Sequence, residues 1–260
     1  MLAWYLFWHL RGKHFDCRIL TFHDIGNKVD LSINRTTVSG FDSILDYLKE
    51  NGFNGTSLSQ QRHEKDVALT FDDGWESFYK NAFPVLQKYN FSATVFVVTD
   101  YIGKFSAWDY QKKRHLNWKQ ISELSAAGIE IASHSATHTD LRGLNDSRLR
   151  HEIINSKKTL EDKLGKPVKY FSYPFGRYDN RAMEMIRTAG YENAYILTGG
   201  GDDYALARHS VYLYDTPYSI YLKLMKHSRL ERCKDYINNS LAGGTIILRK
   251  FAPVRLPRGN

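Results

Sequence analysis

Two clusters of side chains in this chain of 260 residues have the composition of a hydrolytic metal site. The first cluster is the adjacent pair Asp72-Asp73, which directly follows the apolar run 67–71 and precedes Gly74. Adjacent carboxylates at a strand end point in different directions, so one can bind a metal ion while the other faces a substrate. The same Asp-Asp-Gly sequence is also typical of an ordinary turn, so this pair needs a second cluster to support it.

The second cluster contains two histidines, His134 and His138, which follow the apolar run 129–133. If residues 134–138 form a helical turn, both imidazoles lie on one face and can reach the same ion. Taken alone, such a pair can equally be two unrelated surface residues. Two histidines and one carboxylate suit Zn²⁺ best, with Co²⁺ or Ni²⁺ as alternatives, and they leave coordination positions for water and substrate.

Together the two clusters supply the parts of a metal-dependent hydrolase. A bound divalent ion polarises a carbonyl and makes a water molecule more acidic, and the second carboxylate accepts the proton of that water.

These clusters must be positioned by the elements around them, and apolar strands alternate with amphipathic helices along the chain. We expect strands at 17–25, 67–71, 93–99, 129–133, 168–172, 191–197 and 245–248, and helices at 41–48, 75–89, 118–127, 145–164, 180–189 and 218–225. The alternation predicts an α/β fold with a parallel sheet. In such folds the carboxyl ends of the strands carry the active site, which is where both clusters fall.

The bulk composition narrows the classes of partner. The net charge is +8, but the basic residues are scattered, and the densest run is Lys112-Lys113-Arg114-His115. We interpret this run as solvated surface, and with no nucleic-acid-binding motif present we expect no nucleic-acid partner. The only two cysteines, Cys17 and Cys233, form neither a disulfide framework nor a CxxC metal site.

We divide the chain into an apolar N-terminal extension, residues 1–16, and one catalytic domain, residues 17–260. The extension is too short to span a bilayer and has neither a basic n-region nor a small-residue cleavage site. It can be a truncated signal, an interfacial anchor or a strand packed on the body, which leaves membrane contact through it open. We expect a monomer.

Three segments carry a family resemblance. The sequences Thr70-Phe71-Asp72-Asp73-Gly74-Trp75, His134-Ser135-Ala136-Thr137-His138 and Ser172-Tyr173-Pro174-Phe175-Gly176 resemble three motifs of the polysaccharide deacetylases, carbohydrate esterase family four. They occur in the family's order and at its usual separations. The segments Ile19–Ile25 and, less closely, Tyr204–Arg208 are similar to the branch that acts on the exopolysaccharide poly-N-acetylglucosamine.

The resemblance implies a distorted (β/α) barrel of seven or eight units and removal of N-acetyl groups from an N-acetylglucosamine-containing polysaccharide, in an extracytoplasmic or cell-envelope location. It implies that Asp72 is the general base, while the implied metal ligands are Asp73, His134 and His138. The backbone N–H of Phe175 would hold the oxyanion. The implied substrate-binding residues are Tyr173, Pro174 and Arg208.

The sequence departs from the family pattern at the residues that should assist Asp72. Ser172 stands where many members have an arginine that orients the catalytic aspartate, and Arg208 or Arg177 could replace it. Asp202-Asp203-Tyr204 is only distantly similar to the fourth motif.

The fifth motif expects a histidine that acts as general acid after a leucine in the last strand, but Arg249 follows Leu248 here. Arginine stays protonated at working pH, so Arg249 can stabilise the oxyanion but cannot donate the proton. His23 and His209 are candidates for the acid, and we nominate His23. Each can also be a structural residue.

Two functions follow. One is an active N-deacetylase, and the other is a glycan-binding module of the same fold that keeps the metal site but catalyses poorly because Arg249 replaces the acid. The presence of Asp72 favours the enzyme, since a metal or glycan binder needs only Asp73 and the two histidines.

Overall fold

The computed structural model describes residues 18–27, 34–106, 108 and 112–225. The N-terminal extension, both cysteines, and the predicted last strand with Leu248 and Arg249 lie outside these residues. Across the described ranges, no helix combines the length and the apolar character that a membrane crossing requires.

A parallel sheet forms the centre of the domain, in the order β10-β9-β8-β7-β6-β5-β1-β11, with β4 also paired to β5. Its strands are β1 (Ile19–Phe22), β4 (Asn54–Thr56), β5 (Asp66–Phe71), β6 (Thr94–Val97), β7 (Glu130–Ser133), β8 (Tyr170–Ser172), β9 (Asn193–Ile196), β10 (Leu206–Ala207) and β11 (His209–Ser210). A separate pair contains β2 (Asp24–Ile25) and β3 (Arg35–Thr36). The strands predicted between residues 17 and 197 are therefore present, although His23 divides the first into β1 and β2.

Residues 206–210 join the two ends of this sheet. β10 pairs with β9, and after Arg208 the chain continues as β11, which pairs with β1. Since β1 and β9 are the last full strands at either side, this short segment closes the sheet into a barrel. The predicted distorted (β/α) barrel is confirmed.

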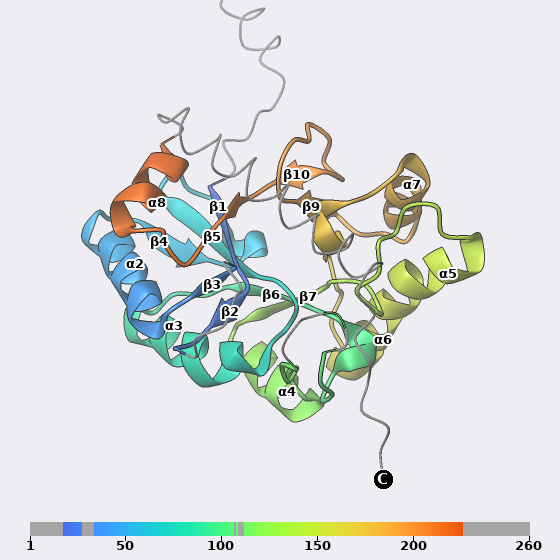
Figure 1. Cartoon of the computed structure of the whole chain (residues 1–260), viewed down its shortest axis with the longest axis horizontal. Coiled ribbons are helices and arrows are strands. Elements are labelled where there is room, and N and C mark those ends of the chain that lie inside the picture. Colours follow the sequence, from blue (N-terminus) through green and yellow to red (C-terminus); the bar gives the residue numbers. More distant parts are fainter. Residues whose placement is uncertain (1–17, 28–33, 107, 109–111, 226–260) are drawn as a thin grey trace, which may run out of the picture.

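Helices cover the outside of the strands, as Figure 1 shows for α2, α3, α4, α6 and α7. The helical elements are α2 (Val38–Glu50), η1 (Leu58–Gln60), η2 (Phe78–Ala82), α3 (Phe83–Tyr89), η3 (Thr99–Tyr101), α4 (Trp118–Ala126), α5 (Asp146–Arg150), η4 (His151–Asn155), α6 (Ser156–Leu164), η5 (Pro174–Gly176), α7 (Asn180–Thr188) and α8 (Pro217–Leu224). The predicted boundaries hold where local chemistry fixes them: Asn145 caps α5, and Gly165 ends α6 in the left-handed conformation. Pro84 lies in the first turn of α3, directly after the π-helical turn η2.

An aromatic cluster in the core fixes the strand ends that carry the first motif. Phe22 of β1 and Phe71 of β5 stack at 5.2 Å between ring centroids, and Phe71 meets Phe78 edge-on at 4.7 Å. All three side chains are at most 1% exposed. Such pairs add about 0.5–1.5 kcal/mol each beyond area burial. The cluster therefore holds the end of β5, and Asp72 directly after it, against β1.

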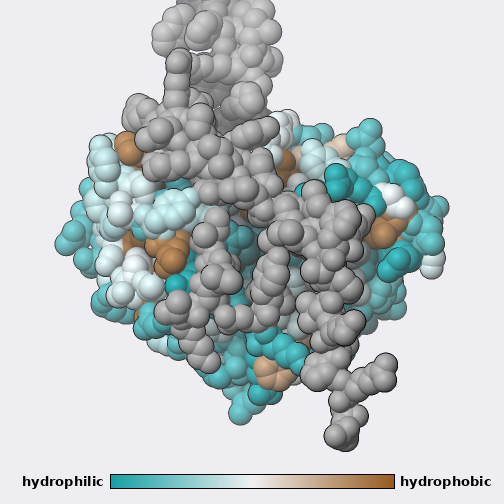
Figure 2. Space-filling view, viewed as in Figure 1, coloured by the Kyte–Doolittle hydropathy of each residue, from teal (hydrophilic) through white to brown (hydrophobic). Residues whose placement is uncertain are grey.

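The described surface of one face is mostly hydrophilic, with isolated hydrophobic residues (Figure 2). The largest exposed apolar side chains, Phe105 and Tyr218, are 55% and 65% exposed. Single residues of this kind are normal on a protein surface.

Candidate active site

The first motif lies at the carboxyl end of β5, where the backbone reverses direction sharply. The N–H of Asp72 donates to the carbonyl of Phe22 at 3.0 Å, which extends the pairing of β1 and β5 by one residue. Asp73 has φ 69° and Gly74 φ 64°, both left-handed. A Cβ on Gly74 would lie 2.9 Å from Cγ1 of Val97, so glycine is required there for both space and conformation. This turn sends the two carboxylates in different directions.

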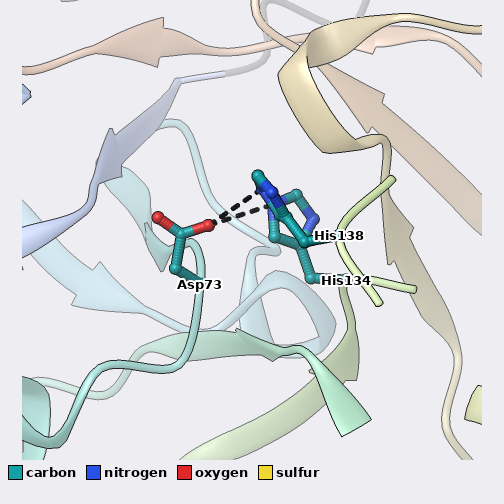
Figure 3. A group of neighbouring side chains, drawn as sticks. All are labelled: Asp73, His134 and His138. Atoms are coloured by element: carbon teal, nitrogen blue, oxygen red, sulfur yellow. Dashed lines mark ion pairs between the residues drawn. The ribbon is translucent and has the colours of Figure 1, made fainter. Parts of the chain in front are cut away.

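Asp73 faces both histidines of the second motif (Figure 3). Its Oδ1 lies 3.5 Å from Nε2 of His134 and 3.2 Å from Nε2 of His138. One ligand atom from each residue can be chosen so that all three lie within 4.8 Å of one another, and all three residues are buried. A tetrahedral ion with bonds of about 2.1 Å separates its ligand atoms by roughly 3.4 Å. The three side chains therefore fit a single Zn²⁺-sized ion, as the sequence predicts.

The histidine tautomer also suits a metal site. Nδ1 of His134 lies 2.7 Å from the carbonyl oxygen of Ser172, and a carbonyl only accepts, so Nδ1 carries the proton. In the neutral ring Nε2 then carries a lone pair that can bind a metal ion, and in the protonated ring Nε2 donates to Asp73. Hydrogen bonds of this kind fix the orientation of metal-binding histidines.

The predicted helical turn at residues 134–138 is wrong. The segment is an irregular loop in which Ser135 has φ 66° and His138 has φ 58°. Each left-handed non-glycine residue costs about 1–2 kcal/mol. The histidine rings meet edge-on, with 4.9 Å between their centroids, through this loop and not through helical periodicity.

Asp72 is held by an arginine from the barrel seam. The two terminal nitrogens of Arg208 donate to the two carboxylate oxygens of Asp72, each at 2.8 Å. Arg208 also donates to Oγ of Ser172 at 2.7 Å, and the Arg208 and Asp72 side chains are 1% and 4% exposed. Arg208 therefore takes the orienting position that Ser172 leaves vacant. The alternative, Arg177, lies 3.5 Å from Asp140 instead.

These contacts set the charge of both carboxylates. Burial alone would raise the pKa of Asp72, but the positive charge of Arg208 outweighs it and holds that pKa below its ordinary value. Burial would likewise raise the pKa of Asp73, whereas hydrogen bonds from His134 and His138 hold it well below the usual range. Both groups are therefore ionised at neutral pH, as the predicted roles of Asp72 as base and Asp73 as metal ligand require.

His23, the predicted acid, lies between β1 and β2 at the same edge of the barrel. Its Nδ1 is buried and has no hydrogen-bond partner among the described residues. Its charge acts on both Asp72 and Asp73, after the stronger effects of their nearer partners. The position is therefore compatible with the predicted role, which stays a prediction. His209 lies in β11, opposite Leu20 of β1.

The third motif lies against the second. The ring of Phe175 meets that of His138 edge-on at 4.6 Å, and Phe175 has φ 59°, so the predicted oxyanion donor is beside a metal ligand. Tyr173 and Pro174 are buried, and the hydroxyl of Tyr173 donates to the carbonyl of Tyr204 at 2.9 Å. Substrate contacts by these two residues and by the buried Arg208 stay predictions.

In the segment with a distant likeness to the fourth motif, Asp202 is exposed and lies 3.5 Å from Arg187.

The sequence interpretation missed an aromatic group beside the metal site. The ring of Trp108 stacks on His138 at 4.4 Å between centroids and approaches Trp75 at 5.7 Å. His115 packs on Trp75 at 4.3 Å, and its Nδ1 lies 2.9 Å from the carbonyl oxygen of Asp73. Burial lowers the pKa of His115 to about 4, so its ring is neutral.

The interpretation of residues 112–115 as solvated surface is therefore wrong in part. His115 is 1% exposed, and Lys113 pairs with Asp24 at 3.1 Å, with 14% of its side chain exposed. Burial begins at His115 and continues at Leu116, after the exposed Lys112 and Arg114, so the neighbouring leucine was the available signal in the sequence.

Comparisons with known proteins identify the family of this chain. Residues 59–194 match the model of the polysaccharide deacetylase family, described as polysaccharide deacetylase. The putative polysaccharide deacetylase YxkH of Bacillus subtilis is 30% identical over 194 residues, which are 71% of this chain and 66% of that protein. The poly-beta-1,6-N-acetyl-D-glucosamine N-deacetylase of Staphylococcus aureus is 26% identical over 192 residues, 65% of this chain and 65% of that protein. The matches thus span just under two thirds of both relatives.

A solved structure shows the same fold. The Streptococcus pyogenes deacetylase PplD, determined in complex with acetate, superposes with a TM-score of 0.69 at 23% identity, covering 79% of this chain and 96% of that chain. The family match, the barrel and the order of the three motifs lead to one assignment: the chain belongs to the polysaccharide deacetylase family.

Proposed function

We propose that this protein is a metal-dependent N-deacetylase that acts on an N-acetylglucosamine-containing polysaccharide, with Zn²⁺ as its metal. One observation carries the proposal: a buried carboxylate, Asp72, is held by Arg208 directly beside the triad Asp73, His134 and His138. A base that is separate from the metal ligands is what amide hydrolysis requires. The Staphylococcus aureus relative, whose name describes poly-beta-1,6-N-acetyl-D-glucosamine, supports this substrate class.

Each residue then has a task in the reaction. When bound to Asp73, His134 and His138, a divalent ion polarises the acetyl carbonyl and makes the attacking water more acidic. Asp72 accepts the proton of that water as its oxygen attacks the carbonyl carbon, and Arg208 keeps Asp72 ionised and oriented.

Two further groups act on the charges that develop. The backbone N–H of Phe175 donates to the oxygen that becomes negative, an interaction that is strongest in the transition state. As the carbon–nitrogen bond breaks, His23 gives its proton to the leaving amine, and acetate is the second product. Arg249 lies outside the described residues, so its effect on the oxyanion stays a prediction.

The aromatic residues beside the site suit the substrate class. Trp108 stacks on His138, and Trp108 and Trp75 approach one another, so together they give the metal site an apolar wall. Aromatic rings with polar edges are suited to bind the apolar faces of sugars. We place the reaction outside the cytoplasm or at the cell envelope, where such polymers are found, and we expect the protein to act as a monomer.

The second candidate is a glycan-binding module that retains the metal site, and the presence of Arg249 at the position of the acid favours it. The Asp72–Arg208 pair argues for the enzyme. A glycan-binding module does not require a buried base. Burial of an ion pair has a desolvation cost, and a catalytic role for Asp72 explains that cost.

The deciding experiment is acetate release from poly-β-1,6-N-acetylglucosamine, chitin oligomers and peptidoglycan. Metal-free protein is assayed before and after addition of Zn²⁺, Co²⁺ or Ni²⁺, with Asp72→Asn as the matched inactive control. Metal-dependent release by the wild type alone supports the proposal. Binding of these glycans without any release would establish the binding module instead.

A further inference from the structure

The loop that carries both histidine ligands has no regular secondary structure of its own. Residues 134–138 contain two left-handed residues, Ser135 and His138, and so do not hold their shape by local preference. One side of the loop is anchored by the backbone of η3: the N–H of Thr99 donates to Ser135 at 3.2 Å, and that of Asp100 to Ala136 at 2.9 Å. These bonds use the loop's carbonyls and leave its N–H groups to other partners.

A single carboxylate satisfies the N–H groups in the middle of the loop. Oε2 of Glu152 accepts from the backbone N–H of Ala136 at 3.0 Å and of Thr137 at 2.9 Å. Oε1 accepts from the hydroxyl of Thr137 at 2.6 Å. Glu152 is 3% exposed and belongs to no motif. Its carboxylate accepts three hydrogen bonds from this loop.

The helix around Glu152 departs from α-helical geometry at this residue. Glu152 lies in η4 (His151–Asn155), a π-helical turn between α5 and α6. A π-turn inserts one residue into a helix and leaves carbonyls without their usual donors, and such turns are frequent at functional sites.

Side chains from two neighbouring elements complete this turn. Oγ of Ser156 donates to the carbonyl of Glu152 at 2.7 Å, and the hydroxyl of Tyr191 donates to that of Ile153 at 3.0 Å. Oγ of Ser156 also lies 2.9 Å from Oγ of Ser133, at the end of the strand that leads into the loop. The turn is therefore tied to the same strand end as the histidines.

We propose that Glu152 is a positioning residue that holds the loop 134–138 in its metal-binding conformation through these three hydrogen bonds, with the π-turn η4 directing its carboxylate. Glu152 acts through the loop, because its three hydrogen bonds come from the backbone N–H groups of Ala136 and Thr137 and from the Thr137 hydroxyl. The inference rests on the proposed metal site and adds a residue that supports it.

The experiment measures metal affinity and not turnover. Zn²⁺ and Co²⁺ dissociation constants of metal-free protein are determined by competition with a chromophoric chelator. Glu152→Ala should weaken binding by about 10–100-fold, the usual effect of losing a partner that orients metal ligands. Glu152→Gln should stay within about threefold of wild type, because its amide oxygen can accept both N–H groups and its NH₂ can donate to Thr137.

A stability-matched control separates positioning from general support. Leu160→Ala removes a fully buried side chain of the neighbouring helix α6, so it should lower stability without changing metal affinity. Amide hydrogen exchange of metal-free protein gives a second readout: exchange at Ala136 and Thr137 should accelerate in Glu152→Ala and remain slow in Leu160→Ala.

Several results would overturn the inference: wild-type affinity in Glu152→Ala, a loss in Glu152→Gln as large as that in Glu152→Ala, or an equal loss in Leu160→Ala. If Glu152→Ala does not fold, Thr137→Val decides: at least about threefold weaker binding supports the inference, and unchanged binding refutes it. A wild type that binds no divalent ion would instead refute the proposed function, and the inference with it.

Discussion

Replacement of Arg208 by methionine tests the central arrangement of the site. Arg208→Met removes the charge and both 2.8 Å hydrogen bonds to Asp72 but keeps an apolar side chain of similar length. Asp72 then stays buried without Arg208, so the burial that favours its neutral form is opposed by the remaining effects of His134 and His23 and no longer by the arginine. The base should therefore be protonated over a wider pH range than in the wild type.

The size of this effect follows from the burial of the pair. An arginine in contact with a carboxylate lowers the pKa of that carboxylate by about 1–3 units. Removal of Arg208 should therefore move the acidic limb of kcat/KM to higher pH by about 1–3 units. On the acidic limb, where the base is mostly protonated in both proteins, we expect roughly a 10- to 1,000-fold loss of activity, since one unit is tenfold, and a much smaller loss at neutral pH. With side-chain exposures of 1% and 4%, loss of one partner should also destabilise the fold by about 3–5 kcal/mol.

The assay is the initial rate of acetate release as a function of pH for wild type, Arg208→Met and Asp72→Asn. Arg208→Met should recover activity as the pH rises, because the base can still lose its proton, whereas Asp72→Asn should not recover at any pH. Arg177→Met is the matched control, since Arg177 pairs with Asp140 and not with Asp72. An acidic limb that does not move in Arg208→Met would show that Arg208 does not set the pKa of the base.

Three further predictions concern single side chains. Asp72→Asn should lose about 10²–10⁴-fold in rate while it still binds metal, whereas His134→Ala should lose both activity and metal binding. Metal titration measures the difference, and an equal loss of metal in the two variants would make Asp72 a ligand. His23→Gln should alter the pH–rate profile, and unchanged limbs with activity within a few-fold would make His23 structural. His115 takes up a proton in the unfolded chain at 6.5 but in the folded one only at about 4. The contribution of His115 to the free energy of unfolding of metal-free protein should thus be fully present above pH 6.5 and fall by about 3 kcal/mol toward pH 4. Denaturant titrations should find this contribution lost in His115→Gln and retained in the exposed control His63→Gln.

The strands and helices were predictable because local patterns encode them. A buried run such as 67–71 reads as a strand wherever it lies, and a cap such as Asn145 or a stop such as Gly165 acts on the residues next to it. The candidate metal ligands could be predicted for a similar reason. Asp73, His134 and His138 lie directly after strands, and carboxyl ends of parallel strands meet at one edge whatever the exact topology.

Local spacing was misleading where a loop, and not a helix, carries the chemistry. The separation of His134 and His138 fits a helical turn, but Ser135 and His138 adopt left-handed conformations that no propensity favours. That shape is stable only because Glu152 and the backbone of η3 bind the loop from outside. Because Glu152 and η3 lie outside residues 134–138, the sequence of these five residues does not encode the shape of the loop.

The sequence by itself predicted the alternating elements, and it singled out the candidate metal ligands and the candidate base of this protein. The tertiary structure alone decided that Arg208 holds Asp72, across a separation of 136 residues. The physical reason is closure of the barrel. Only when residues 206–210 pair with β9 on one side and β1 on the other does Arg208 reach Asp72, and a one-residue change of register would turn its side chain to the opposite face.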